Sequence, residues 1–251
     1  MKRNKIIAGI VLVGLLSLPS AAVEFKSGFS AGVNMSQLIG SDAKTLDDST
    51  KALSNVGLDP VIASYPQYSG FTGSVRFCAE FNNWVALLSE LSFAKQGNIW
   101  KGTAKIAKII SGVNDTVTSD ITIERRLSYL SVPLFIAFKP HFGAWSPMLY
   151  GGPSFAFNFF AENSKNVVGG KSGLTDIKYL TYAKTDPADT TKHDLVLFNG
   201  QACFGAGVSY TFHGYDIVLD ARYSRGGTSI IKGKAIDMSS IAVTLGLLVP
   251  R

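Results

Sequence analysis

The sequence predicts an all-β fold, an eight-stranded antiparallel up-and-down transmembrane β-barrel with long extracellular loops. Eight segments alternate in side-chain chemistry, as strands do. In residues 71–81 the odd positions are aromatic, aliphatic or glycine, and the even positions are small, polar or charged. Eight strands enclose only enough space for side chains. A charged face turned inward therefore leaves the apolar face outside, against lipid.

The first four strands are predicted at residues 25–38, 68–81, 84–94 and in a fourth segment that ends at residue 138. Asn82 and Asn83 separate the second strand from the third, and asparagine tolerates the backbone conformation of a tight turn. In the third strand Leu88 is the exception, an apolar residue on the polar side. In the fourth, every second residue from 130 to 138 is apolar.

The last four strands are predicted at residues 149–159, 196–210, 216–224 and 240–247. His213 and Gly214 form the turn between the sixth and the seventh. Each segment supplies about ten residues, which is the length that a tilted strand needs to cross a bilayer.

The connections alternate between short and long. Short turns are predicted near residues 82–83, 142–143 and 213–214, and long connections at residues 40–67, 95–122, 161–194 and 226–235. This layout is typical of outer-membrane barrels. Aromatic residues gather at the short-turn end, as an interfacial girdle would: Phe25, Phe81, Trp84, Phe142, Trp145, Phe212 and Tyr215. The segment 99–110 is either a continuation of the strands or a basic loop helix carrying Lys101, Lys105 and Lys108.

Two prolines, Pro133 and Pro153, fall inside predicted strands. Each removes a ladder hydrogen bond, and we expect a β-bulge at each site.

Residues 1–22 are predicted to be a signal peptide that is removed, and residues 23–251 an outer-membrane β-barrel domain. Three cations precede an apolar run of about 13 residues, which is too short for a membrane-spanning helix, and small residues follow near Ala22. We therefore expect export, with the bacterial outer membrane as the destination.

The net charge gives no reason to expect a nucleic-acid partner. The chain is formally +6, but Lys2, Arg3 and Lys5 of the predicted signal peptide supply three of these charges, which leaves the rest near +3. The expected partners are outer-membrane lipid and lipopolysaccharide, together with a surface or secretion protein.

The polar parity predicts a luminal network of Arg76, Glu80, Glu90, Asp220 and Arg222, with Lys26 and Lys139 near the periplasmic end. Charges in so narrow a space must be paired or hydrogen-bonded. The network is either a structural plug or a gated path for ions or protons. The two cysteines, Cys78 and Cys203, lie at different heights on separated strands, so we predict two unbridged thiols.

Four short motifs resemble the PorT-like outer-membrane β-barrel family. They are SELSFAKQG (89–97), LSYLSVPL (127–134), YGGPS (150–154) and DARYSRG (220–226). The resemblance extends over the chain after residue 22 and makes both prolines expected. It implies an eight-stranded barrel in the outer membrane of Gram-negative bacteria, and the family's named member takes part in a secretion system.

We therefore predict a non-enzymatic membrane barrel without cofactor or metal, whose surface loops bind a partner. One alternative is a lipid-modifying enzyme at the outer rim, with His193 as its base and Ser164 or Ser172 nearby. The other is a soluble, lipocalin-like exported binder with the apolar face inside.

Overall fold

The computed structural model describes residues 23–40, 58–64, 66–110, 113–171, 176–184, 196–230 and 236–250. The predicted signal peptide, His193 and Ser172 lie outside the described residues, as does the side chain of Ser164. None of the described residues forms a helix long and apolar enough to cross a membrane.

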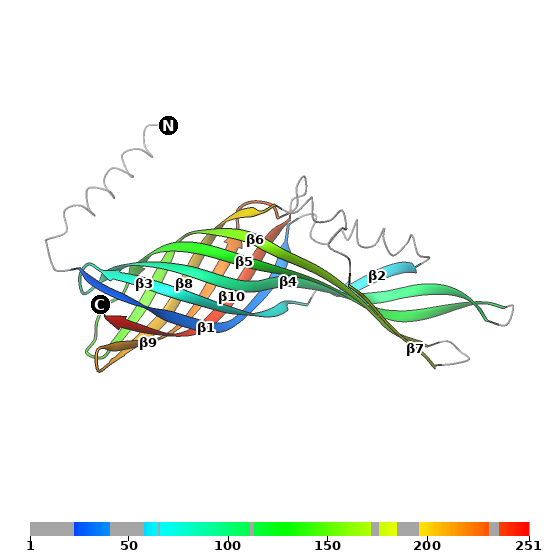
Figure 1. Cartoon of the computed structure of the whole chain (residues 1–251). Coiled ribbons are helices and arrows are strands. Elements are labelled where there is room, and N and C mark those ends of the chain that lie inside the picture. Colours follow the sequence, from blue (N-terminus) through cyan, green and yellow to red (C-terminus); the bar gives the residue numbers. More distant parts are fainter. Residues whose placement is uncertain are drawn as a thin grey trace, which may run out of the picture.

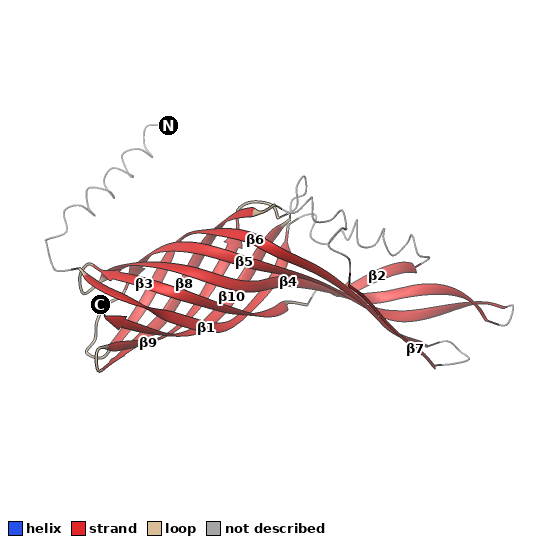
Figure 2. Cartoon of the chain, in the orientation of Figure 1, coloured by secondary structure: helices blue, strands red, loops and turns tan. Residues whose placement is uncertain are grey.

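Eight antiparallel strands close into a ring, which confirms the predicted fold class (Figures 1 and 2). Neighbouring strands follow the order β1–β3–β4–β5–β6–β8–β9–β10, and β10 pairs with β1. The ring strands are β1 (Glu24–Ile39), β3 (Tyr68–Glu80), β4 (Val85–Ile110), β5 (Val113–Phe138), β6 (Trp145–Lys171), β8 (Phe198–Phe212), β9 (Tyr215–Gly226) and β10 (Asp237–Pro250).

The strands are strongly staggered. The stagger can be measured by moving from Phe138 in β5 to its partner in β6 and then from strand to strand around the ring. The path passes Phe71 in β3 and returns to β5 at Ser128, ten residues from its start. Such a stagger requires the strands to tilt against the barrel axis. It also brings residues that are distant in sequence to the same height inside the ring.

The apolar face of the ring is outside. Phe77, Leu219 and Val243 are 46%, 50% and 38% exposed, whereas Arg76 and Asp220 are 7% and 2% exposed. All eight strands keep the predicted parity. The lipocalin-like alternative, which needs the apolar face inside, is therefore wrong.

Three ring strands continue far beyond the ring. β4 and β5 have 26 residues each and β6 has 27. Two short strands extend this sheet, β2 (Leu58–Ser64) beside β4 and β7 (Asp176–Lys184) beside β6. We call the part of β4, β5 and β6 above the ring, together with β2 and β7, the extension sheet; it projects from one end of the barrel in Figure 1.

The extension sheet corrects the prediction of a long loop at residues 95–122. All of these residues except 111–112, which lie outside the described set, belong to β4 or β5. The alternative of a basic helix at residues 99–110 is also wrong, because this segment pairs with β5 throughout. Part of the predicted loop at residues 161–194 is likewise strand, in β6 and β7.

The predicted bulges at the two prolines are absent. The register of β5 against β6 is the same before and after Pro133 and Pro153, and its shifts lie instead at Ser119/Asp120 and Ser128/Tyr129. The ladder omits the pairs of Leu134 and Phe135 with β6 and then resumes. An isolated missing N–H is thus accommodated as a gap in the ladder, without an extra residue in the strand.

The short turns have the predicted residues. Asn82 Oδ1 accepts hydrogen bonds from the backbone N–H groups of Trp84 and Val85 at 2.8 and 2.9 Å. His213 and Gly214 have φ values of +50° and +83°. Two successive residues with positive φ match the right-handed twist of the flanking strands in a two-residue hairpin.

Candidate functional site

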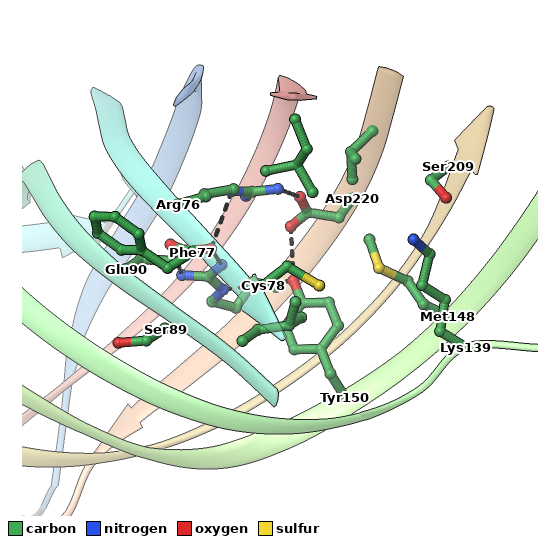
Figure 3. A pocket seen from close by; sticks show the side chains of 14 residues that line it. Arg76, Phe77, Cys78, Ser89, Glu90, Lys139, Met148, Tyr150, Ser209 and Asp220 are labelled. Atoms are coloured by element: carbon green, nitrogen blue, oxygen red, sulfur yellow. Dashed lines mark hydrogen bonds and ion pairs between the residues drawn. The ribbon is translucent and has the colours of Figure 1, made fainter. Parts of the chain in front are cut away.

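The middle of the barrel holds a group of buried charges, which we call the central cluster: Arg76, Glu90, Asp220 and Arg222. Arg76 Nη1 lies 2.6 Å from Asp220 Oδ2, and Arg76 Nε lies 3.0 Å from Glu90 Oε1. Figure 3 shows Arg76 extending toward Asp220 inside the ring. Two hydroxyls complete the cluster: Tyr150 donates to Asp220 Oδ1 at 2.6 Å, and Thr244 donates to Asp220 Oδ2 at 2.8 Å.

Arg222 connects opposite sides of the ring. Its Nη1 and Nη2 donate to the two carboxylate oxygens of Glu90 at 3.0 and 2.7 Å. β9, which carries Arg222, and β4, which carries Glu90, are four strands apart in a ring of eight. The guanidinium also lies 4.7 Å from the ring centroid of Phe135. Bidentate pairing combined with an aromatic face suits arginine and would not suit lysine.

A second group of charges, the lower cluster, lies at the short-turn end: Lys26, Glu80, Lys139 and Asp216. Lys26 Nζ is 3.1 Å from both Glu80 Oε2 and Asp216 Oδ2. Lys139 Nζ is 2.6 Å from Glu80 Oε1 and 3.0 Å from Asp216 Oδ2. The two ammonium groups and the two carboxylates therefore form a closed arrangement.

The structure places all five predicted luminal residues inside the ring, but in two groups. Arg76, Glu90, Asp220 and Arg222 meet in the central cluster, whereas Glu80 belongs to the lower cluster with the two predicted lysines. Sequence reasoning did not include Asp216 or Tyr150 in the network. The parity of β9 is the signal for Asp216, because it shares the inward face with Asp220.

An apolar layer separates the two clusters. Along β3, Cys78 lies between Arg76 and Glu80, and along β9, Val218 lies between Asp216 and Asp220. This layer comprises the buried Cys78, Ala86, Ala137, Met148, Val218 and Leu248, with Leu88 packed against it. Both cysteines are free, as predicted. A cavity of about 20 Å³, which is room for about one water molecule, is lined by Met148, Val218 and Leu248 of this layer together with the four charged residues of the central cluster.

The opposite mouth of the barrel is closed by apolar side chains. Ile230 and Ile236, which follow β9 and precede β10, are buried against Leu127, Tyr129, Ala156 and Met238. Ile230 N–H donates to Ile236 O at 2.8 Å, and Val196 N–H donates to Ile230 O at 2.9 Å. These hydrogen bonds hold the chain after β9 over the mouth.

Both clusters are balanced, with two cations and two carboxylates in each. Buried charges are tolerated when they are paired, and every charged group of the two clusters has an oppositely charged partner within 3.1 Å. No group of His, Cys, Asp or Glu within the described ranges is arranged to hold a metal ion. What these side chains can do is join β1, β3, β4, β6, β9 and β10 to one another through the interior.

Solved structures of other bacterial barrels show weak overall similarity. Neisserial surface protein A is 12% identical with a TM-score of 0.38, covering 89% of this chain and 96% of its own. The attachment invasion locus protein Ail of Yersinia pestis is 15% identical with a TM-score of 0.36, covering 90% and 99%. The outer membrane protease OmpT from Escherichia coli is 9% identical with a TM-score of 0.38, covering 94% and 100%.

The comparison with curated proteins gave no match. A family model, by contrast, matches residues 20–232, most of the chain. Its description is an outer membrane protein beta-barrel domain, and the closed ring with its apolar exterior agrees with it. The chain belongs to the outer membrane protein beta-barrel domain family.

Proposed function

We propose that this protein is a non-enzymatic barrel of the outer membrane that holds the extension sheet at the cell surface, where the sheet binds a partner protein. The observation that carries the proposal is the length of β4, β5 and β6, at 26, 26 and 27 residues. A strand needs about 9–11 residues to cross a bilayer. More than half of each of these strands is therefore not needed to span the membrane.

The extension sheet has two outer strands that suit a protein partner. Among the described residues, β2 pairs with β4 alone and β7 pairs with β6 alone. An edge strand presents backbone N–H and C=O groups, to which an extended segment of another protein can add as a further strand. The barrel interior offers no comparable surface, because paired charges and apolar layers fill it.

The resemblance to PorT-like barrels suggests what class of partner this is. A subunit of a protein secretion system would meet the extension sheet from the cell surface or during export. The motifs that carry the resemblance lie mainly in the ring strands, so they support a shared scaffold more directly than a shared partner.

Crosslinking in living cells tests the proposal. A photo-reactive residue in place of Tyr182 of β7, which is paired with Asn166 of β6, is expected to give a discrete adduct with one protein. The same residue in place of Tyr215, at the short-turn end, serves as the control. Because deletion of residues 161–194 also removes position 182, its effect is measured with the photo-reactive residue in place of Val61 of β2. The deletion should abolish that adduct while the barrel still shows heat-modifiable migration. An adduct that persists after the deletion, or none from any position in β2 or β7, would contradict the proposal.

A further inference from the structure

The outer surface of the ring is uncharged over most of its height. Among the described outward-facing positions of the ring strands, none is charged within residues 25–35, 71–79, 85–93, 130–138, 145–159, 198–212, 215–223 and 241–249. We call this surface the belt. The first outward-facing cation on β4 is Lys95, two residues beyond Phe93 and about 7 Å along the strand. Lys95 Nζ lies 5.3 Å from the ring centroid of Phe71, at the upper edge of the belt.

Two further cations share the outward face next to Lys95. Arg126 of β5 is paired with Gly97 of β4, and its side chain is 43% exposed. Its Nε and Nη2 donate to Glu124 Oε2 at 3.1 and 2.5 Å, which holds the guanidinium over the sheet. Lys101 of β4 is exposed further along. Glu162 of β6 is paired with Arg126, so with Glu124 included this rim patch has three cations and two carboxylates.

Aromatic side chains form a continuous surface directly below the rim patch. Phe71 and Phe93 have ring centroids 5.3 Å apart, and Phe93 and Phe159 are 5.8 Å apart. Phe159 belongs to β6, so these three rings extend from β3 to β6 across the outer face of β5. A basic patch thus lies directly above an aromatic surface on one side of the barrel.

We propose that the rim patch and the three phenylalanines form a binding site for a phosphorylated glycolipid of the outer leaflet, which is the lipid A part of lipopolysaccharide. Short turns face the periplasm in barrels of this kind, so the end that carries Lys95 is in the outer leaflet. The cations bind the phosphate groups, and an acyl chain lies along Phe71, Phe93 and Phe159. This site is independent of the partner proposed for the extension sheet.

The charges of the two partners are complementary, and their geometry agrees. Lipid A carries phosphates at the level where its acyl chains begin, and the protein places its cations where the belt ends. Each basic residue near an anionic lipid surface contributes about 1 kcal/mol. Loss of Lys95 and Arg126 together should therefore weaken binding about 30-fold, and loss of either alone about fivefold.

The test measures retention of bisphosphorylated lipid A by the detergent-solubilised barrel in native mass spectrometry. Lys95→Gln combined with Arg126→Gln is expected to weaken retention about 30-fold. The matched control is Arg225→Gln, an exposed cation on β9 at the opposite side of the ring, which should leave retention unchanged. Lipid A without phosphates should bind the unmodified barrel as weakly as bisphosphorylated lipid A binds the double variant.

Three results would overturn the proposal: an equal loss with Arg225→Gln, equal binding of lipid A without phosphates, or full retention by the double variant. Heat-modifiable migration shows whether each variant is folded. If the double variant does not fold, the two single variants decide, and retention unchanged in both would overturn the proposal in the same way.

Discussion

The Glu90 carboxylate accepts hydrogen bonds from Arg222 and also forms an ion pair with Arg76, so one carboxylate binds two guanidinium groups. Asp220 in turn engages Arg76, Tyr150 and Thr244. Each member of the central cluster is therefore held by partners from at least two other strands. Removing one member would leave a buried charge without compensation, and that costs more than the net stabilisation that the intact pair supplies.

Asp220→Ala should lower the free energy of unfolding by about 3–5 kcal/mol, because Arg76 would remain buried and lose its closest carboxylate. Urea unfolding in lipid vesicles, followed by tryptophan fluorescence, measures the change. Asp237→Ala, at the partly exposed start of β10, is the control and should stay within about 0.5 kcal/mol of the unmodified protein. Equal losses of unfolding free energy in the two variants would mean that the central cluster does not stabilise the barrel.

Leu219→Arg tests the orientation of the belt at a single position. Leu219 is outward-facing and half exposed in the middle of β9. An arginine facing lipid near the bilayer midplane should destabilise the barrel by about 2–4 kcal/mol. Ser69→Arg makes the same change at the outer end of β3, where the penalty falls to about 0–1 kcal/mol. The same unfolding assay distinguishes them, and a tolerated arginine at 219 would argue against lipid at this face.

At the residue scale, sequence parity was sufficient to place Arg76, Glu90 and Arg222 inside, because a side chain's face depends only on its position along its own strand. Pairing across the ring depends on the stagger as well. Arg222 meets Glu90 only because ten residues of shear bring β9 and β4 to a common height. No local pattern reports that stagger, which is why the pairing of Tyr150 with Asp220 could not be predicted. For Asp216 the parity of β9 gives the inward face but not the partners.

At the element scale, the turn between β8 and β9 depends on positive φ values at His213 and Gly214. Gly214→Val should destabilise the barrel by about 1–2 kcal/mol, because a β-branched residue is strongly disfavoured in this conformation. His213→Asn should be neutral, since asparagine adopts it readily. Thermal unfolding of the two variants in one detergent provides the comparison. A stable Gly214→Val barrel would indicate that the turn relaxes to another type.

The extension sheet shows where strand prediction from sequence stops. Residues 95–122 alternate only weakly, and above the membrane neither face of a sheet has to be purely apolar. The period-two pattern fades there, although the backbone pairing of β4 with β5 continues without a shift to Ile110 and Val113. The sequence does not predict β2 or β7 either. Each forms only because the strand beside it, β4 or β6, extends far enough to pair with it. The predicted bulges at Pro133 and Pro153 are wrong for a different reason. A strand pair can lose individual hydrogen-bonded pairs without a change of register.

At the scale of the whole molecule, the interior is layered along the barrel axis. The lower cluster, the apolar layer, the central cluster and the apolar mouth follow one another. This order arises because charged and apolar residues alternate at every second position of the strands, as in Glu80, Cys78 and Arg76 of β3. Each charged layer is thereby separated from water on at least one side, which strengthens its ion pairs.

Layering also predicts how the barrel behaves as a barrier. An ion crossing it would have to pass the apolar layer around Met148, Val218 and Leu248. The cavity that these three residues line together with the central cluster holds about one water molecule. Eight strands leave no continuous aqueous channel, and a bare charge in such a layer costs many kcal/mol. We therefore expect purified protein in planar bilayers to show no steady conductance, whereas a porin added to the same membrane conducts. Stable open levels, above all ones altered by Met148→Ala, would show that the charged clusters line a path for ions and do not simply join the strands.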